Sequence, residues 1–224
     1  MKTNEKTTAV HAGGAAKANA VNDTLKLPLA DAFENDLTTL LEEAEGANVV
    51  AITMVDLDHF MEVNTRYGHE AGDRVLIETG EYFRNAIPSG SRLYRYGGDS
   101  FAIVWGEGIE REEAFLRTEQ LRAGYAVIMP DDAKRTISAG VAAAPEDGTR
   151  YTELVRKADG AMMRAKMGER NRVCLAREEK MATKTTHYTA EQLQRLSRLS
   201  KKEGIGEAVL LREALDMLLK KYDA

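Results

Sequence analysis

The stretch Asn48-Val-Val-Ala-Ile-Thr-Met-Val-Asp-Leu-Asp58 decides the fold of this chain. Its continuous apolar and β-branched residues predict a strand that is buried on both faces. Two carboxylates, Asp56 and Asp58, stand where this strand ends. A buried strand with acidic residues at its carboxyl end predicts a site with carboxylate ligands at one edge of a sheet.

A hairpin is expected further along the chain, where two short β-like segments (residues 91–96 and 101–105) flank Gly97-Gly98-Asp99-Ser100. If the hairpin pairs with the first strand, Asp99 lies close to Asp56. The remaining apolar periodicity predicts helices and further strands in mixture, which favours an α/β or α+β sheet domain. Helices are expected over 31–45, from about Asp73 through Phe83, over 110–122 and over 152–167, and strands over 136–143 and 172–175.

The composition limits the class of protein. The chain has 224 residues, of which 43% are hydrophobic, so it can bury a core and carry a small second domain. The net charge of −5 argues against a surface generally coated by nucleic acid. The single cysteine, Cys174, cannot form an internal disulfide and favours a reducing, cytoplasmic setting. No apolar run approaches the ~18 residues of a membrane span, so no membrane partner is expected.

The chain divides by pattern into four parts. Residues 1–21 indicate a flexible N-terminus, 22–176 the main domain, 177–183 a linker and 184–224 a separate tail. The tail carries 8 Lys/Arg against 6 Asp/Glu, a net charge of +2, which leaves −7 for residues 1–183. It contains a strand-like stretch, 184–188, and two amphipathic helices around Gly204-Ile-Gly206. These helices cannot bury both apolar faces in so short a segment, so the tail needs a partner.

Asp56, Asp58 and Asp99 could together form a magnesium site. Mg²⁺ takes hard oxygen ligands and usually keeps one or two protein carboxylates, with phosphates and water completing the octahedron. Gly97 and Gly98 leave room where a substrate approaches the backbone. Taken singly, the acidic pair could simply end a strand and the glycines could form an ordinary turn.

Five segments, in this order, resemble the GGDEF family of diguanylate cyclases, and Leu27-Pro28 and Ala32-Phe33 echo the family's opening turn. The resemblance implies an α+β, palm-like domain with a central, mostly antiparallel sheet flanked by helices. The segments are Val55-Asp-Leu-Asp-His-Phe60 with Asn64 and Tyr67-Gly-His-Glu-Ala-Gly-Asp-Arg-Val-Leu76; Arg95-Tyr-Gly-Gly-Asp-Ser-Phe101; Ser138-Ala-Gly-Val-Ala142; Ala158-Asp-Gly-Ala-Met-Met-Arg-Ala-Lys166; and Arg170-Asn-Arg-Val173.

The resemblance also implies an activity, in which two GTP-loaded domains meet and each 3′-hydroxyl attacks the other's α-phosphate to give cyclic di-GMP. It implies Mg²⁺ or Mn²⁺ as cofactor, held by Asp56, Asp99 and the backbone carbonyl of Leu57. The signature Gly97, Gly98, Asp99 and Ser100 would form the catalytic loop. The substrate residues would be Asn64 and Asp73 at the guanine edge, Phe60 beside them, and Lys166 and Arg170 at the phosphates.

Two positions depart from the family pattern. Ser100 stands where active members carry the Glu that completes the metal site and helps to deprotonate the attacking hydroxyl. Losing a positioned base commonly costs ~10²–10⁴ in rate. Met61 stands where the family usually has Lys near the phosphates. The family's product-inhibition site is also missing, because Pro88-Ser-Gly-Ser91 replaces its Arg-x-x-Asp.

The tail resembles a ribbon-helix-helix DNA-binding domain. In that family two chains pair their strands into a ribbon that enters the major groove of DNA. The outward, DNA-binding residues would be Lys184, Thr186 and Tyr188, or Thr185 and His187 in the other register. A helical hairpin used only for dimerisation is the alternative, and either version predicts a homodimer.

Three hypotheses follow for the whole chain. In the first it is a slow diguanylate cyclase tethered to a DNA-binding dimeriser. In the second it is a catalytically degenerate GGDEF domain that makes a ribbon-helix-helix regulator respond to GTP or a related nucleotide. In the third the GGDEF domain is only a scaffold. Ser100 and Met61 favour the second over the first, and the retained guanine and phosphate residues disfavour the third.

Overall fold

The structure, a computed structural model, describes residues 20–44, 48–127, 133–176, 186–203 and 206–222. It forms two compact units, Met1–Glu178 and Glu179–Ala224. In the first unit, five strands form one sheet in the order β2-β3-β1-β4-β5, and every neighbouring pair is antiparallel except β4 and β5. The mostly antiparallel sheet expected from the sequence is confirmed. The strands are β1 (Val50–Leu57), β2 (Arg92–Gly97), β3 (Ser100–Val104), β4 (Ile137–Ala144) and β5 (Val173–Leu175).

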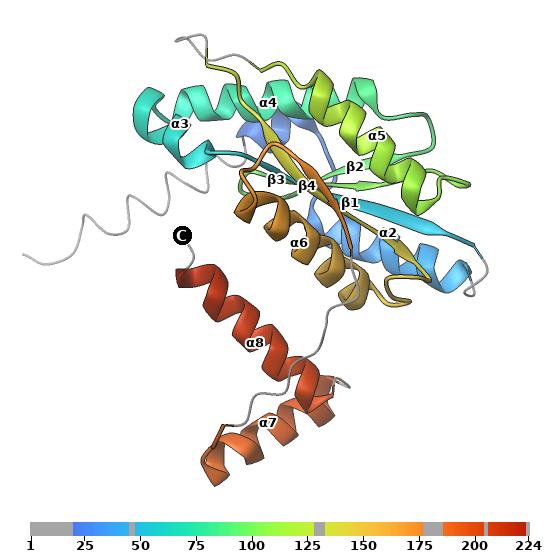
Figure 1. Ribbon diagram of the computed structural model, residues 1–224, viewed down its shortest axis with the longest axis vertical. Coiled ribbons are helices and arrows are strands. Elements are labelled where there is room, and N and C mark those ends of the chain that lie inside the picture. The colour runs from blue at the N-terminus through green and yellow to red at the C-terminus, as the bar shows by residue number, and fades with distance from the viewer. Residues whose placement is uncertain (1–19, 45–47, 128–132, 177–185, 204–205, 223–224) are drawn as a thin grey trace, which may run out of the picture. The chain divides into compact units, whose positions relative to one another are not determined.

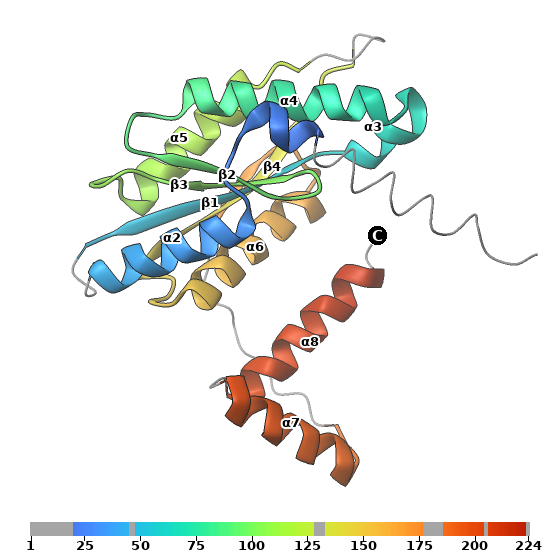
Figure 2. The ribbon, with the colours of Figure 1, turned by 180° about the vertical axis from the view of Figure 1, so that it is seen from behind.

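Helices cover both faces of this sheet, which makes a three-layer unit (Figure 1, Figure 2). Helices α4 and α5 pack on one face, with α3 next to α4, and α2 and α6 pack on the other. Alternate residues of β1 enter the two cores, and all eight of its positions are buried because the strand is central and covered on both sides. The helices are α2 (Ala30–Glu43), α3 (Phe60–Tyr67), α4 (His69–Ala86), α5 (Arg111–Gly124) and α6 (Tyr151–Met167).

The β2–β3 hairpin forms as the signature loop predicted. Gly98 has φ +45°, a left-handed conformation that suits a residue without a Cβ. The antiparallel register sets Asp56 opposite Ser100, and the backbone N–H of Leu57 donates to the carbonyl oxygen of Asp99 at 3.3 Å. The hairpin loop is therefore fastened to the end of β1.

One helical region differs from the expectation. The sequence predicted a single helix beginning near Asp73, whereas α3 precedes it and α4 already begins at His69. Gly68, with φ +81°, separates the two helices. The reason is that α3 is polar: Val63 is its only buried residue, so the apolar periodicity that reveals a helix is almost absent there.

The N-terminal edge of the described unit begins with a helical turn over residues 20–25, two residues before the boundary expected from the sequence. Val21 and Leu25 are buried. Leu25 packs directly over Gly80 of α4, where an added Cβ would lie 2.7 Å from a Leu25 methyl carbon.

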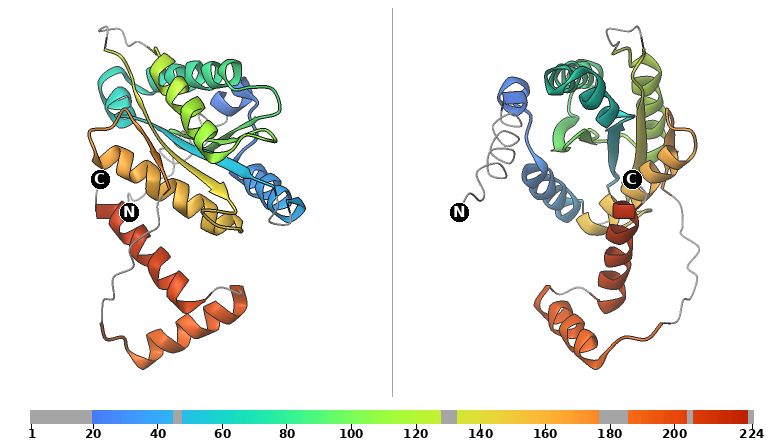
Figure 3. Two further views of the ribbon diagram at one scale, coloured as in Figure 1. Left: turned by 45° about the vertical axis from the view of Figure 1, so that its right-hand side comes forward. Right: turned by 90° about the vertical axis from the view of Figure 1, so that its left-hand side faces the viewer.

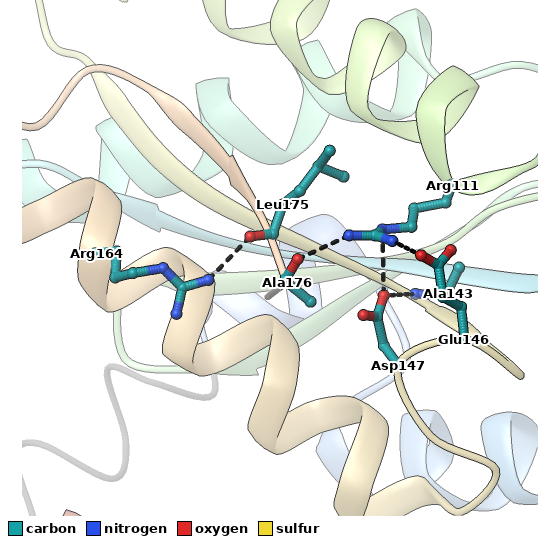
Figure 4. A network of polar contacts seen from close by, with 7 residues as sticks. All are labelled: Arg111, Ala143, Glu146, Asp147, Arg164, Leu175 and Ala176. Carbon is teal, nitrogen blue, oxygen red and sulfur yellow. Dashed lines mark hydrogen bonds and ion pairs between the residues drawn. The ribbon is translucent and has the colours of Figure 1, made fainter. Parts of the chain in front are cut away.

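The C-terminal end of the first unit is held by two arginines from different helices (Figure 4). Arg111 of α5 donates to the carbonyl of Ala176 at 2.7 Å, and Arg164 of α6 donates to the carbonyl of Leu175 at 2.9 Å. Arg111 also pairs with Asp147 at 3.4 Å and with Glu146. The backbone is therefore fixed as far as residue 176.

The second unit is a pair of helices, α7 (Ala190–Glu203) and α8 (Glu207–Tyr222), seen from two sides in Figure 3. A capping box starts α7: the Thr189 N–H donates to Gln192 Oε1 at 2.9 Å, and the Gln192 N–H donates to Thr189 Oγ1 at 3.2 Å. Of the expected strand, 184–188, the structure describes residues 186–188, which have no regular secondary structure. Lys184 and Thr185 lie outside the described residues.

Candidate functional site

The site is centred on Asp56 at the carboxyl end of β1, where its side chain is buried. Its Oδ1 lies 2.6 Å from Lys166 Nζ of α6, and its Oδ2 accepts a hydrogen bond from the Ser100 hydroxyl at 3.0 Å. Burial, and then the nearby charge of Asp99, raise the pKa of the Asp56 carboxyl above its usual range. Lys166, expected at the phosphates, is therefore paired with an expected metal ligand.

The donor atoms at this point fit a divalent cation that keeps several outside ligands. Asp56 and Asp99 supply two carboxylates close enough for the charge of Asp99 to raise the pKa of Asp56, and Leu57 follows Asp56 at the end of β1. Within the described ranges, no group of three or more His, Cys, Asp or Glu side chains is placed to hold a metal. Hard oxygen donors in this small number match Mg²⁺, which completes its shell with phosphates and water.

Asp58, the other carboxylate of the strand end, has a structural position. Its side chain is 2% exposed and accepts hydrogen bonds from Thr136 Oγ1 and Ser138 Oγ, both at 2.7 Å, and from the Asn171 N–H at 3.0 Å. These donors occupy both carboxylate oxygens. Asp58 therefore ties β1 to β4 and to the loop after α6 and is not oriented as a ligand.

Two expected substrate residues of α3 come together over Gly72. A Cβ at position 72 would lie 2.1 Å from Asn64 Oδ1 and 3.2 Å from Phe60 Cζ, so both side chains of α3 lie over this glycine of α4. Asp73, the other expected guanine residue, follows Gly72 along α4.

Arg95 is a residue of the site that the sequence prediction did not assign. It is 8% exposed, its guanidinium lies 5.0 Å from the centre of the Phe101 ring, and Nη1 is 3.5 Å from the Ser100 carbonyl oxygen. Burial lowers the pKa of Arg95, and the charges of Asp99 and Asp73 oppose this. The charge of the buried Arg95 therefore interacts with Asp99, an expected metal ligand, and with Asp73, an expected guanine-binding residue. Its place two residues before the signature glycines was the available signal.

The remaining expected residues are exposed. Arg170 is exposed in the loop after α6, and Met61 is 79% exposed on α3. In the second unit, Thr186 is exposed and Tyr188 is 44% exposed. No helix in the described part of the chain combines the length and the apolar character that crossing a membrane requires.

Comparison with known families agrees with this fold. The family described as diguanylate cyclase, GGDEF domain, matches residues 22–172, and the chain therefore belongs to the GGDEF family. The C-terminal residues 184–223 match the ribbon-helix-helix domain family, and this tail is a ribbon-helix-helix domain.

Characterised relatives are similar along the first unit. The chain is 31% identical over 153 residues to the diguanylate cyclase VdcA of Vibrio cholerae, covering 63% of this chain and 42% of that protein. It is 33% identical over 145 residues to diguanylate cyclase A of Treponema denticola, covering 63% and 39% respectively. The chain thus spans less than half the length of these relatives.

Solved structures show the same fold. The GGDEF domain of PA1120 (YfiN or TpbB) from Pseudomonas aeruginosa superposes with a TM-score of 0.65 at 29% identity, over 69% of this chain and 99% of that one. The active GGEEF domain of a diguanylate cyclase from Vibrio cholerae gives a TM-score of 0.64 at 26% identity, over 68% and 99%. The fourth letter of that active signature is Glu, where this chain has Ser100.

Proposed function

We propose that this chain is a GTP-responsive DNA-binding protein, in which a catalytically weakened GGDEF domain senses the nucleotide and a ribbon-helix-helix tail dimerises and binds DNA. The observation that carries this proposal is the contact between Ser100 Oγ and Asp56 Oδ2 at 3.0 Å. At the position of the family's catalytic Glu, a neutral donor faces the buried carboxylate. The guanine and phosphate residues around it are retained.

Guanine recognition rests on Asn64 and Asp73. A carboxylate can accept hydrogen bonds from the N1–H and the amino group of guanine, whereas adenine offers neither donor at the equivalent positions. Gly72 leaves the space that the Asn64 side chain occupies. The phosphates would bind to Lys166 and Arg170, cations that suit phosphate oxygens.

Mg²⁺ or Mn²⁺ would be held by the Asp56 and Asp99 carboxylates and the Leu57 carbonyl, and when bound it would polarise the phosphates. Lys166 lies 2.6 Å from Asp56 and neutralises this carboxylate. With a cation held by Asp56, the Lys166 ammonium would be available to the phosphates.

The tail supplies the second half of the proposal. Ribbon-helix-helix domains act as dimers, and a homodimer would give the exposed residues Thr186 and Tyr188, together with Lys184, a two-stranded ribbon for the major groove. A tail dimer also holds two GGDEF domains at an effective concentration in the mM range for a short linker. DNA and GTP as ligands imply a cytoplasmic location.

A slow diguanylate cyclase is the second candidate, and it is favoured by the convergence of Asp56, Leu57 and Asp99 at one edge of the sheet. Two domains facing each other would join two GTP molecules: each 3′-oxygen forms a bond to the other α-phosphorus, and each pyrophosphate leaves. Without Glu at position 100, the hydroxyl proton has no side-chain base there.

Incubation of the purified protein with GTP and Mg²⁺ or Mn²⁺, followed by chromatography, separates the candidates, with Asp99→Ala as the control. Intact GTP, together with a GTP-dependent change in DNA affinity that Asp73→Ala removes, supports the sensor. A cyclic dinucleotide peak that is absent from the control supports the cyclase. If neither GTP nor Mg²⁺ changes the thermal midpoint, both candidates fail and the domain is a scaffold.

A further inference from the structure

The loop after α6 has an unusual backbone. Three consecutive residues that are not glycine, Glu169, Arg170 and Asn171, have φ of +74°, +59° and +46°. A side chain with a Cβ is disfavoured in this left-handed region, and Asn tolerates it better than most. Such a run persists only when surrounding contacts fix it. The middle residue, Arg170, is the phosphate cation of the proposed function.

One set of contacts holds the loop from inside the domain. The Asn171 N–H donates to the buried Asp58 carboxylate at 3.0 Å, and the Arg170 N–H donates to the carbonyl of Ala165 at 3.1 Å. These bonds join the loop to the end of β1 and to the last turn of α6. They fix the side of the loop that faces the domain interior.

A second set of contacts holds it from α5. Arg122 Nη1 donates to the side-chain oxygen of Asn171 at 3.0 Å, and the same guanidinium pairs with Glu119 at 2.8 Å. Glu119 Oε1 in turn accepts the Val173 N–H at 3.1 Å. The planar guanidinium bonds both neighbours at once, so the Glu119–Arg122 pair braces residues 171 and 173.

We propose that Glu119 and Arg122 are positioning residues for Arg170: by bracing the left-handed loop they hold the Arg170 side chain where it can bind the phosphate chain of the nucleotide. This rests on the proposed binding of GTP to the domain. It assigns a role in ligand affinity to a face of α5 outside the signature motifs. Neither residue itself needs to touch the ligand.

The same helix offers a matched control. Arg117 pairs with Glu113 at 2.6 Å, as Arg122 pairs with Glu119, and both pairs carry the same charges. Among the described residues, Arg117 bonds Glu113 and none of residues 169–173, whereas Arg122 and Glu119 bond the loop directly. Comparing Arg122→Ala with Arg117→Ala therefore separates bracing of the loop from removal of a helix-surface ion pair.

The test measures affinity for GTP with Mg²⁺ and for guanosine, which lacks phosphates, on the full chain. Arg122→Ala should weaken GTP binding about tenfold, the scale of one lost charge-assisted contact, and leave guanosine binding within about twofold. Arg117→Ala should change neither affinity. Arg170→Ala should weaken GTP binding similarly, and the double variant with Arg122→Ala should be no weaker than Arg170→Ala alone, because both act through one side chain.

Arg122→Lys separates position from charge, since it keeps the cation but cannot bond Asn171 and Glu119 in the same plane. Arg122→Lys should weaken GTP binding nearly as much as Arg122→Ala does. Amide hydrogen exchange in residues 168–174 should become faster in both Arg122 variants and stay unchanged in Arg117→Ala. Unchanged GTP affinity in Arg122→Ala, or full additivity with Arg170→Ala, overturns the inference. A wild-type chain that binds neither ligand overturns the proposed function itself.

Discussion

The two units of the chain differ in where their large apolar side chains lie. In the first unit the core residues of the sheet and of α2 to α6 are buried on both sheet faces, and Phe33, Phe83 and Phe101 are fully covered. In the second unit the corresponding residues are open: Leu215 is 54% exposed, Leu218 52% and Tyr222 72%.

The first unit therefore buries its own core, whereas the second unit leaves apolar side chains exposed. A pair of helices buries little apolar surface, and exposed apolar faces of this kind are typical of association sites. Residues 186–189, the part of the expected strand region that the structure describes, have no regular secondary structure. Substitutions in the core of the first unit should therefore change its free energy of unfolding, whereas substitutions on the apolar face of the tail should change the dimer dissociation constant.

The largest effect is expected from Asp58→Ala, which removes the acceptor of three hydrogen bonds, one buried and two partly buried. The free energy of unfolding of the first unit should fall by about 4 kcal/mol, because Thr136, Ser138 and the Asn171 N–H lose their partner. Urea unfolding measures this. The control Asp99→Ala, a carboxylate in the open hairpin loop, should cost less than about 1 kcal/mol. Equal losses would remove the distinction between a structural and a ligand-binding carboxylate.

A slightly smaller effect is expected on the tail from Leu218→Ala. If this side chain is buried between two tails, each copy loses about 2 kcal/mol, so the dimer dissociation constant should rise roughly 10³-fold. Sedimentation equilibrium over a dilution series measures it. Met217→Ala is the matched control, because Met217 is also exposed, at 67%, but lies off the apolar face of Leu215 and Leu218. The same dissociation constant in both variants would contradict a dimer through this face.

Ser100→Glu tests whether the active site of the first unit lacks only the carboxylate that would act as its general base. Turnover of GTP to a cyclic dinucleotide should rise by roughly 10² or more, the usual contribution of a positioned base. In the Leu218→Ala background this gain should decline on dilution, since two domains must meet. Absence of product from Ser100→Glu at any concentration would show that the site lacks more than the carboxylate.

The smallest effect is expected from Gly72→Ala, whose Cβ would displace the Asn64 side chain. GTP affinity should fall about tenfold, with reduced preference for GTP over ATP, as one hydrogen bond to the base is lost. Titration calorimetry measures both. Gly80→Ala is the control: its Cβ meets Leu25, so it should reduce stability and leave the nucleotide preference unchanged. Since this is a property of one chain, the Leu218→Ala background should not alter it.

Local patterns allowed most of the elements to be predicted. The apolar run of β1, the glycine turn of the hairpin and the helical periodicity of α2, α5 and α6 depend on neighbours in sequence, and all five elements formed. Helix α3 was missed because its buried face is a single residue, Val63. The expected tail strand begins at Lys184, outside the described residues, and residues 186–188 have no regular secondary structure.

The site was predictable as a set of residues but not as a set of contacts. Asp56 and Asp58 look equivalent in the sequence. Only the fold brings Lys166 and Ser100 to the first, and Thr136, Ser138 and Asn171 to the second. The structural role of Asp58 and the central place of Arg95 could not be read from spacing.

By itself, the sequence determined the family, the order of the strands and of the helices other than α3, the hairpin at Gly97 and Gly98, and the two altered positions Ser100 and Met61. Periodicity and short motifs are local properties of the chain. The tertiary structure decided which charge neutralises which, and how the left-handed loop at Arg170 is braced. Those outcomes depend on contacts such as that between Asp58 and Asn171, which are 113 residues apart in the chain. Only folding brings such residues into a shared, water-poor environment where each buried charge must find its partner.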